Sequence, residues 1–215
     1  MSETENRELV SYLKKTGALK SKALEKALLK TPRRLFVPED LQMSAYNDYP
    51  LHIGCGQTIS QPSTVVMMTQ LLEPKAGQKI LEIGSGSGWQ SALLSRLVGK
   101  KGKVFTVELI TELAEFARKN LAKLKIKNVK VVFGNGSIGL GEEAPFDRII
   151  ITAAAPSIPD ALKSQLKIGG RIVAPVGDRY AQKMTILKKT RKGFAQEELP
   201  SYFAFVPLRG KEGFE

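Results

Sequence analysis

The glycine-rich stretch LEIGSGSGWQS at residues 81–91 contains the residue types needed to hold a polar or anionic ligand on main-chain amides. Gly84, Gly86 and Gly88 follow a short apolar run and precede a helical pattern. Glycines at such a junction let N–H groups and a helix N-terminus approach the ligand closely. The spacing is G-x-G-x-G. It differs from the dinucleotide fingerprint because Trp89 stands where that fingerprint needs its third glycine.

Two further turns carry polar residues at the same kind of junction. Glu108 lies 20 residues after Gly88, at the end of the next apolar run. A carboxylate there can accept hydrogen bonds from both ribose hydroxyls, and it would repel the 2′-phosphate of NADP. The sequence GNGSIG follows the third apolar run at residues 134–139, where Asn135 is placed to meet an adenine edge. The three turns together predict a nucleoside site.

The elements that position these residues alternate regularly. Strand-like runs stand at 79–84, 103–109, 129–134, 146–152 and 170–177, with helical patterns at 89–99, 111–126 and 159–166. Thr111 is the expected N-cap of the second helix. Two more strand-like runs, 183–190 and 201–208, follow with no helix between them. We predict a doubly wound α/β fold, whose mostly parallel seven-stranded sheet has an antiparallel C-terminal edge.

The first 78 residues have a different organisation. Residues 5–30 contain one or two helical patterns, and residues 31–40 form a proline-bounded connector. The stretch up to residue 64 shows little regular periodicity but has enough apolar residues to be packed. Long segments of this kind in compact domains are usually functional or disordered.

Composition excludes several classes of protein. The single cysteine cannot form an internal disulfide, and with the single histidine it makes a poor metal cluster, so we expect no metal. No apolar run approaches the ~18 residues of a membrane span, and the N-terminus lacks the pattern of a signal peptide. We therefore expect a cytoplasmic protein that binds no membrane.

The net charge of +12 allows two interpretations. One is a surface for nucleic acid, and the other is a lysine-rich, solvated exterior. Several lysines fall where helical faces would meet water, and arginine-rich blocks are absent from the sequence. We favour the second interpretation and expect no nucleic-acid partner.

The chain resembles the class I S-adenosylmethionine-dependent methyltransferases in LEIGSGSG, Glu108 and the strand pattern. More narrowly, GQTISQP (56–62), APFDRIIITAAAP (144–156) and LKIGGRIVAPVG (166–177) resemble the protein-L-isoaspartate O-methyltransferases. One departure is Asn135, where the family usually has aspartate. The sequence shows no linker, internal repeat or low-complexity segment, so we expect one domain over residues 1–215. Residues 1–78 would form an N-terminal helical and loop extension carrying the active-site loop, and residues 79–215 the cofactor-binding core.

The resemblance also implies roles for individual residues. Ser60 would be the active-site residue, orienting the substrate carboxylate. Substrate contacts are expected from Thr58, Ala153, Ala154 and Ala155. Contacts with S-adenosyl-L-methionine are expected from Glu82, Gly84, Ser85, Gly86, Gly88, Glu108, Leu109, Asn135, Gly136 and Ser137.

The implied reaction is methylation of the free α-carboxylate of L-isoaspartyl residues in damaged proteins and peptides, which starts repair through a succinimide. A carboxylate with a pKa near ~4 is ionised at neutral pH, so no general base is needed. His52 is then expected to have a packing or surface role, and Trp89 to lie in the core or the cofactor-pocket wall. For Arg33 and Arg34 the sequence leaves two roles open: contact with the peptide substrate, or exposure to solvent.

Two other functions remain open from the sequence. The net charge allows an RNA methyltransferase, although the Asp/Asn-Pro-Pro-aromatic signature of base methylation is absent after the fourth strand, where TAAAP stands. Asn135 allows a nucleoside-binding module without catalysis. Methyl transfer to an isoaspartyl peptide and to its aspartyl counterpart separates the three.

Overall fold

The computed structural model describes residues 2–214, and its centre is a seven-stranded sheet in the order β5-β4-β3-β6-β7-β8-β9. The strands from β5 to β7 are parallel, and β8 and β9 are antiparallel to their neighbours. This confirms the predicted fold class and the antiparallel C-terminal edge. The strands are β3 (Lys79–Ile83), β4 (Lys103–Glu108), β5 (Val129–Phe133), β6 (Phe146–Ile151), β7 (Leu166–Gly177), β8 (Gln182–Thr190) and β9 (Gly193–Phe203).

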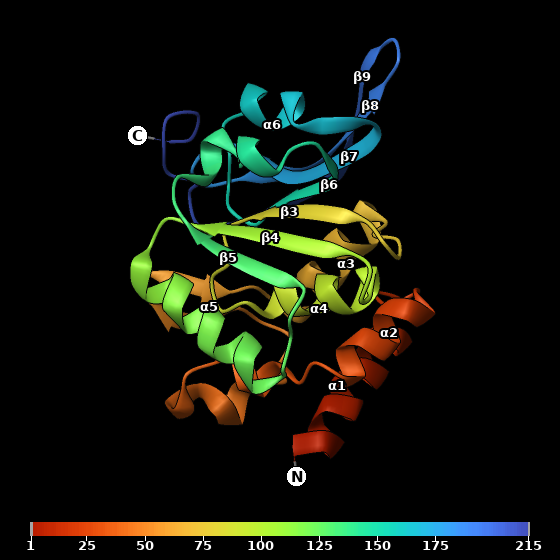
Figure 1. The fold of residues 1–215 in the computed structure, drawn as a ribbon. Helices are drawn as coiled ribbons and strands as arrows, with labels where there is room; N and C mark the ends of the chain where they lie inside the picture. The colour runs from red at the N-terminus through yellow and green to blue at the C-terminus, as the bar shows by residue number, and fades with distance from the viewer. Residues whose placement is uncertain (1, 215) are drawn as a thin grey trace.

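Helices cover both faces of the sheet (Figure 1). One face carries α3 (Pro62–Leu72), α4 (Trp89–Val98) and α5 (Thr111–Lys123), and the other carries α6 (Asp160–Ser164). The short 3₁₀ turns η3 (Gly136–Ile138) and η4 (Gly141–Glu143) follow β5. Apolar side chains of strands such as β3 and β6 are buried on both faces, as expected for parallel strands covered by helices.

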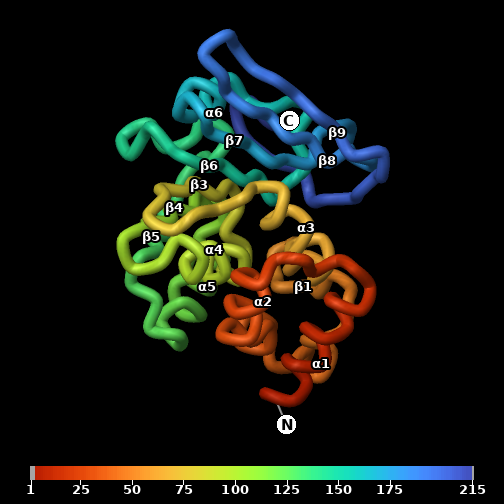
Figure 2. The backbone as a smooth tube through the Cα atoms, turned by 90° about the vertical axis from the view of Figure 1, so that its right-hand side faces the viewer, coloured from red at the N-terminus to blue at the C-terminus, as the bar shows by residue number. Residues whose placement is uncertain are grey.

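The N-terminal segment forms an outer layer beyond α3 and α4. It consists of α1 (Ser2–Lys15), α2 (Lys22–Leu29), η1 (Arg33–Phe36), η2 (Glu39–Ser44) and a hairpin of β1 (Leu51–Gly54) and β2 (Gln57–Ile59). Figure 2 shows this red-to-orange segment at the bottom of the view and the β8–β9 hairpin at the top. One buried apolar cluster includes residues of α1, α2, the hairpin, α4 and α5. This shared core supports the proposal that residues 1–215 are one domain.

Four details of the sequence prediction were wrong. The stretch at 51–59 is a β-hairpin and the following residues are helix α3, although neither has a clear period in the sequence. The last strand begins at Gly193, directly after the turn, and ends at Phe203. Ile110 rather than Thr111 is the N-cap of α5, so no side chain caps that helix. The hairpin strands are short and β9 lies at the sheet edge, so these strands carry weak periodicity. Apolar residues fill most of α3, so no polar face marks its helical period.

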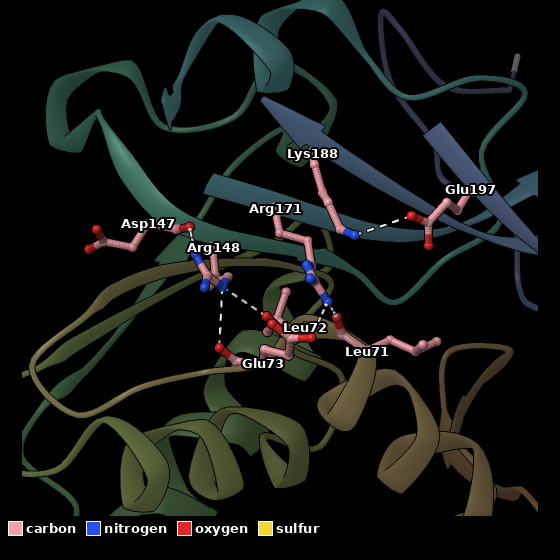
Figure 3. Close-up of polar contacts among 8 residues, drawn as sticks. All are labelled: Leu71, Leu72, Glu73, Asp147, Arg148, Arg171, Lys188 and Glu197. Atoms are coloured by element: carbon pink, nitrogen blue, oxygen red, sulfur yellow. Dashed lines mark hydrogen bonds and ion pairs between the residues drawn. The ribbon is translucent and has the colours of Figure 1, made fainter. Parts of the chain in front are cut away.

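The C-terminal end of α3 is bound to the sheet by two arginines (Figure 3). Arg148 of β6 donates from Nε to the carbonyls of Leu72 at 2.8 Å and Glu73 at 3.3 Å. Arg171 of β7 donates to the Leu71 carbonyl and forms an ion pair with Glu73 at 2.9 Å. The last carbonyls of a helix lack intrahelical partners, and cations are favourable near them. These contacts fix the helix that directly follows the hairpin.

We expect Arg148→Ala to lower the free energy of unfolding by about 1.5–3 kcal/mol, because buried carbonyls lose a charged donor. Urea denaturation measures the change. Lys188→Ala is the matched control, since Lys188 forms an exposed ion pair with Glu197 at 3.2 Å. Exposed pairs contribute about 0–1 kcal/mol. Equal losses for the two variants would contradict the proposed anchoring of α3.

Candidate active site

A cavity of about 370 Å³ lies at the carboxyl ends of β3, β4 and β6. Open α/β sheets bind ligands at this edge, and the volume falls in the range of small-molecule sites. Its wall combines the glycine loop, the end of β4, strand β2 and the C-terminal segment. The predicted site residues that line it are Thr58, Ser60, Glu82, Gly84, Ser85, Gly86, Glu108, Leu109, Gly136 and Ala153.

Glu108 connects the glycine loop to the end of β4. Its Oε2 accepts hydrogen bonds from the Gly86 amide at 2.9 Å and the Ser85 hydroxyl at 3.4 Å. Its Oε1 accepts from the amides of Leu109 at 2.9 Å and Ile110 at 3.1 Å. The side chain is nearly buried but lines the cavity. The carboxylate is therefore fixed in place, and its remaining lone pairs can accept from hydroxyl groups of a ligand.

Glu82 is a fully buried carboxyl group at the same cavity. The Ser91 hydroxyl donates to its Oε2, and Oε1 has no partner among the described residues. Burial raises the pKa of Glu82 from 4.5 to about 8, against the opposing effect of the Ser91 hydrogen bond. Glu82 is therefore largely protonated at neutral pH and can donate a hydrogen bond.

The hairpin brings Thr58 and Ser60 into the cavity lining, together with the glycine loop. Cys55 and Gly56 form its two-residue turn with φ of 53° and 68°, and positive φ at both positions is typical of a type I′ turn. Ser60 follows β2 directly, and its hydroxyl has no hydrogen-bond partner among residues 2–214. The hydroxyl is thus available to a ligand.

Arg33 contacts neither solvent nor the cavity, so both interpretations from the sequence were wrong. Its side chain is completely buried, and its guanidinium donates to main-chain carbonyls around the hairpin. Arg34 donates from Nε to the Gln42 side chain at 2.9 Å. The sequence gives little sign of a buried cation, because its partners are carbonyl groups that every residue possesses.

Five predicted site residues lie outside the cavity lining. Gly88 caps α4 with φ of 86°, and a Cβ there would lie 3.3 Å from Ala117, so this glycine serves close helix packing. The Asn135 Oδ1 accepts from the Ser137 amide and hydroxyl, which makes Asn135 the N-cap of η3. Ala154 bonds to Val206 and Leu208, and Ala155 to Pro175.

These contacts provide local structural reasons for those residue types. The small side chains of Ala154 and Ala155 allow residues 206–208 and the end of β7 to bond to the chain that follows β6. A cofactor contact by Gly88, Asn135 or Ser137, and a substrate contact by Ala154 or Ala155, therefore receive no support from the cavity lining.

The sequence analysis missed part of the cavity wall. Residues 206–209 cross the carboxyl edge of the sheet, where Pro207 bridges to Ala154. Arg209 is the one cationic side chain among the described residues of the lining, and it is exposed. Ile110 and Leu113 add apolar surface. Residues 206–209 reach the site only because a segment distant in sequence crosses the end of β6, whereas Ile110 and Leu113 directly follow the predicted turn at Glu108.

Trp89 and His52 lie where the sequence analysis expected them. Trp89 is buried and lines the cavity. His52 and Cys55 are exposed on the hairpin and do not line it. Within residues 2–214 no group of three or more His, Cys, Asp or Glu side chains could hold a metal ion. Over the same residues no helix is long and apolar enough to span a bilayer.

Known proteins are similar to this chain in sequence and in fold. The sequence model of the family described as protein-L-isoaspartate(D-aspartate) O-methyltransferase matches residues 4–213. The chain belongs to this family. A protein-L-isoaspartate O-methyltransferase of Methanopyrus kandleri is 50% identical over 208 residues, covering 96% of this chain and 92% of the relative. One from Staphylothermus marinus is 45% identical over 219 residues, covering 99% and 97%.

Solved structures of the family have the same fold. A protein-L-isoaspartate O-methyltransferase superposes with a TM-score of 0.88 and 32% identity, over 97% of this chain and 67% of that one. A Plasmodium falciparum protein of this family, solved with S-adenosyl-L-homocysteine, gives a TM-score of 0.85 at 25% identity, over 95% and 98% of the two chains. Family membership thus agrees with the resemblance found in the sequence.

Glu82 leads to a pH prediction. Its pKa is raised in the folded state, so the folded protein holds one more proton than the unfolded chain between pH 4.5 and about 8. Its contribution to stability is present below pH 4.5 and is lost as pH rises through about 8. We expect Glu82→Gln to remove this decline from denaturation curves measured between pH 5 and 8. Parallel profiles for the variant and the unaltered protein would show that Glu82 is ionised when folded.

Proposed function

We propose that this protein transfers a methyl group from S-adenosyl-L-methionine to the free α-carboxylate of L-isoaspartyl residues in damaged proteins and peptides. One observation carries the proposal. A single cavity joins a nucleoside-type half, formed by the glycine loop and Glu108, to a half formed by Thr58, Ser60 and Ala153. Membership of the protein-L-isoaspartate O-methyltransferase family supports the same reaction.

The residues present fit the cofactor. The fixed Glu108 carboxylate would accept hydrogen bonds from the ribose hydroxyls. Leu109, Ile110 and Leu113 offer an apolar wall for the adenine ring. The glycine loop and the N-terminus of α4 would bind the carboxylate of the methionine moiety. The protonated Glu82 lies deeper in the same half and adds a polar group without a second negative charge.

The chemistry makes few demands on side chains. S-adenosyl-L-methionine supplies an electrophilic methyl group on a sulfonium, which is a good leaving group. The attacking carboxylate has a pKa near ~4 and is already ionised, so no base must remove a proton. The cavity lining contains no histidine among the described residues, in agreement with this requirement. The protein has to orient the carboxylate and exclude water. Such positioning can lower the activation free energy by several kcal/mol.

Ser60 is the residue we propose for that orientation. Its free hydroxyl can donate to one oxygen of the substrate carboxylate and leave the other oxygen to attack. It is not proposed as a nucleophile, because no base lies beside it to activate the hydroxyl. Arg209 lies in the same wall as an exposed cation and would favour an anionic substrate.

The product of this step is a methyl ester. We propose that the ester then closes without further catalysis to a succinimide, when a neighbouring backbone amide nitrogen attacks and methanol leaves. Hydrolysis of the succinimide returns part of the chain to normal aspartyl. The expected partners are therefore proteins and peptides with isoaspartyl damage, not nucleic acid. A cytoplasmic location remains a prediction from the sequence.

The deciding experiment measures transfer of a radiolabelled methyl group to three acceptors: an isoaspartyl peptide, its aspartyl counterpart and RNA. We expect label on the isoaspartyl peptide alone. Label on RNA would favour the RNA methyltransferase, and cofactor binding without any transfer would favour a non-catalytic binding module.

Changing Ser60 tests the orienting hydroxyl. We expect Ser60→Ala to lower kcat/KM for an isoaspartyl peptide by roughly tenfold to a thousandfold, the loss typical of one orienting donor. Cofactor affinity and melting temperature should stay close to their original values. Ser63→Ala is the matched control, because Ser63 lies on α3 outside the cavity. Full activity of Ser60→Ala would remove Ser60 from the mechanism.

Changing Glu108 tests the cofactor half. We expect Glu108→Gln to weaken binding of S-adenosyl-L-homocysteine by roughly tenfold or more, since charge-assisted hydrogen bonds contribute about 1.5–3 kcal/mol. Calorimetry measures the affinity, and circular dichroism checks the fold. Glu112→Gln on the exposed face of α5 is the control. Unchanged affinity in a folded Glu108→Gln protein would place the ribose elsewhere.

A further inference from the structure

Arg33 is a buried cation that the proposed chemistry leaves unused. It begins η1 (Arg33–Phe36), and its side chain is 0% exposed. Burial lowers the pKa of Arg33 to about 10, with Asp48 acting in the opposite direction, so the group is still a cation at neutral pH. Among the described residues no carboxylate forms an ion pair with it. Its charge is stabilised instead by the dipoles of main-chain carbonyls.

Those carbonyls belong to two segments on either side of the hairpin. From the preceding segment, Nη1 donates to Ala45 at 2.8 Å and to Asn47 at 3.4 Å, and Nη2 donates to Tyr49 at 3.1 Å. From the end of β2, Nη2 also donates to Ile59 at 3.4 Å and Ser60 at 3.1 Å. The guanidinium therefore joins the chain entering the hairpin to the residue that follows it.

The same guanidinium lies on the ring of Trp89, with its Cζ 5.5 Å from the ring centroid. Trp89 is the first residue of α4, directly after the glycine loop, and it lines the cavity. Its Nε1 donates to the carbonyl of Thr31 at 3.1 Å. One buried group thus touches both the main chain of Ser60 and the helix that begins at the cofactor-type loop.

We propose that Arg33 is a positioning residue for methyl transfer, which sets the place of the Ser60 hydroxyl relative to the cofactor half of the cavity. This inference rests on the proposed function. Arg33 does not touch the reacting atoms, and it acts through the main chain of Ser60. The planar guanidinium has five donors in a fixed fork, and a lysine ammonium cannot reach the same carbonyls together.

A double-mutant cycle tests the inference. Arg33→Lys and Arg33→Gln are each made alone and together with Ser60→Ala, and initial rates are measured on an isoaspartyl peptide with both substrates saturating. If Arg33 acts through Ser60, each Arg33 variant should lower kcat by roughly tenfold to a hundredfold. In the Ser60→Ala background the same change should cost less than about threefold, because residues that act as one unit are not additive.

Controls separate positioning from folding. Arg34→Lys should leave kcat nearly unchanged, since this neighbouring guanidinium donates to the Gln42 side chain and does not line the cavity. Rates are measured well below the melting temperature of each variant. Binding of S-adenosyl-L-homocysteine gives the fraction of protein molecules whose cofactor site is intact. Glutamine carries no charge, so burying it without all of the main-chain carbonyl partners costs less stability than burying a lysine there. Arg33→Gln is therefore expected to fold more readily than Arg33→Lys.

The outcomes are distinct. The positioning role is supported if the Arg33 variants lower kcat in the unaltered background but not in the Ser60→Ala background, while cofactor affinity stays the same. Equal losses in both backgrounds, unchanged kcat, or failure of both Arg33 variants to fold would overturn it in favour of a purely structural role. The unaltered protein is assayed alongside, and its inactivity on the isoaspartyl peptide would instead refute the proposed function.

Discussion

A guanidinium that leaves water must recover most of its hydrogen bonds inside the protein. The Nη1 and Nη2 atoms of Arg33 donate to five backbone carbonyls, whereas its buried Nε has no partner among the described residues. Residues 45–49 and 59–60 must therefore converge on one point. That convergence gives a short, polar hairpin a defined position, although most of its own side chains are not buried. Contact with Trp89 extends the constraint to helix α4 and the glycine loop. The two halves of the cavity are thus held relative to each other by buried polar contacts as well as by apolar packing.

Arginine side chains also donate to main-chain carbonyls where α3 meets the sheet. Arg148 and Arg171 bind the last carbonyls of the helix, whereas Pro62 and the bond from the Ser63 amide to Asp48 lie at its start. The helix leads directly out of the segment that contains Ser60. Its two ends are therefore tied to different layers of the molecule, one to the N-terminal segment and one to strands β6 and β7.

Within the cavity the two carboxyl groups differ because their surroundings differ. Glu108 accepts four hydrogen bonds, three of them from main-chain amides. Glu82 is fully buried with one hydroxyl donor, so burial favours the neutral form. One acceptor and one neutral carboxyl group can then share a small cavity without the repulsion of two negative charges.

The sequence by itself determined the layered α/β core and the nucleoside half of the site. Strong periodicity and glycine turns are local signals. These signals predicted that Gly84, Gly86 and Glu108 lie at the carboxyl edge of the sheet, where the cavity is. Only the tertiary structure decided the burial of Arg33, the bonds that hold the hairpin to it, and the entry of Arg209 into the cavity wall. It also bonded Ala154 to Val206 and Leu208, and Ala155 to Pro175. These outcomes depend on contacts between residues far apart in the chain, often through backbone groups that are identical at every position. A local pattern cannot encode them.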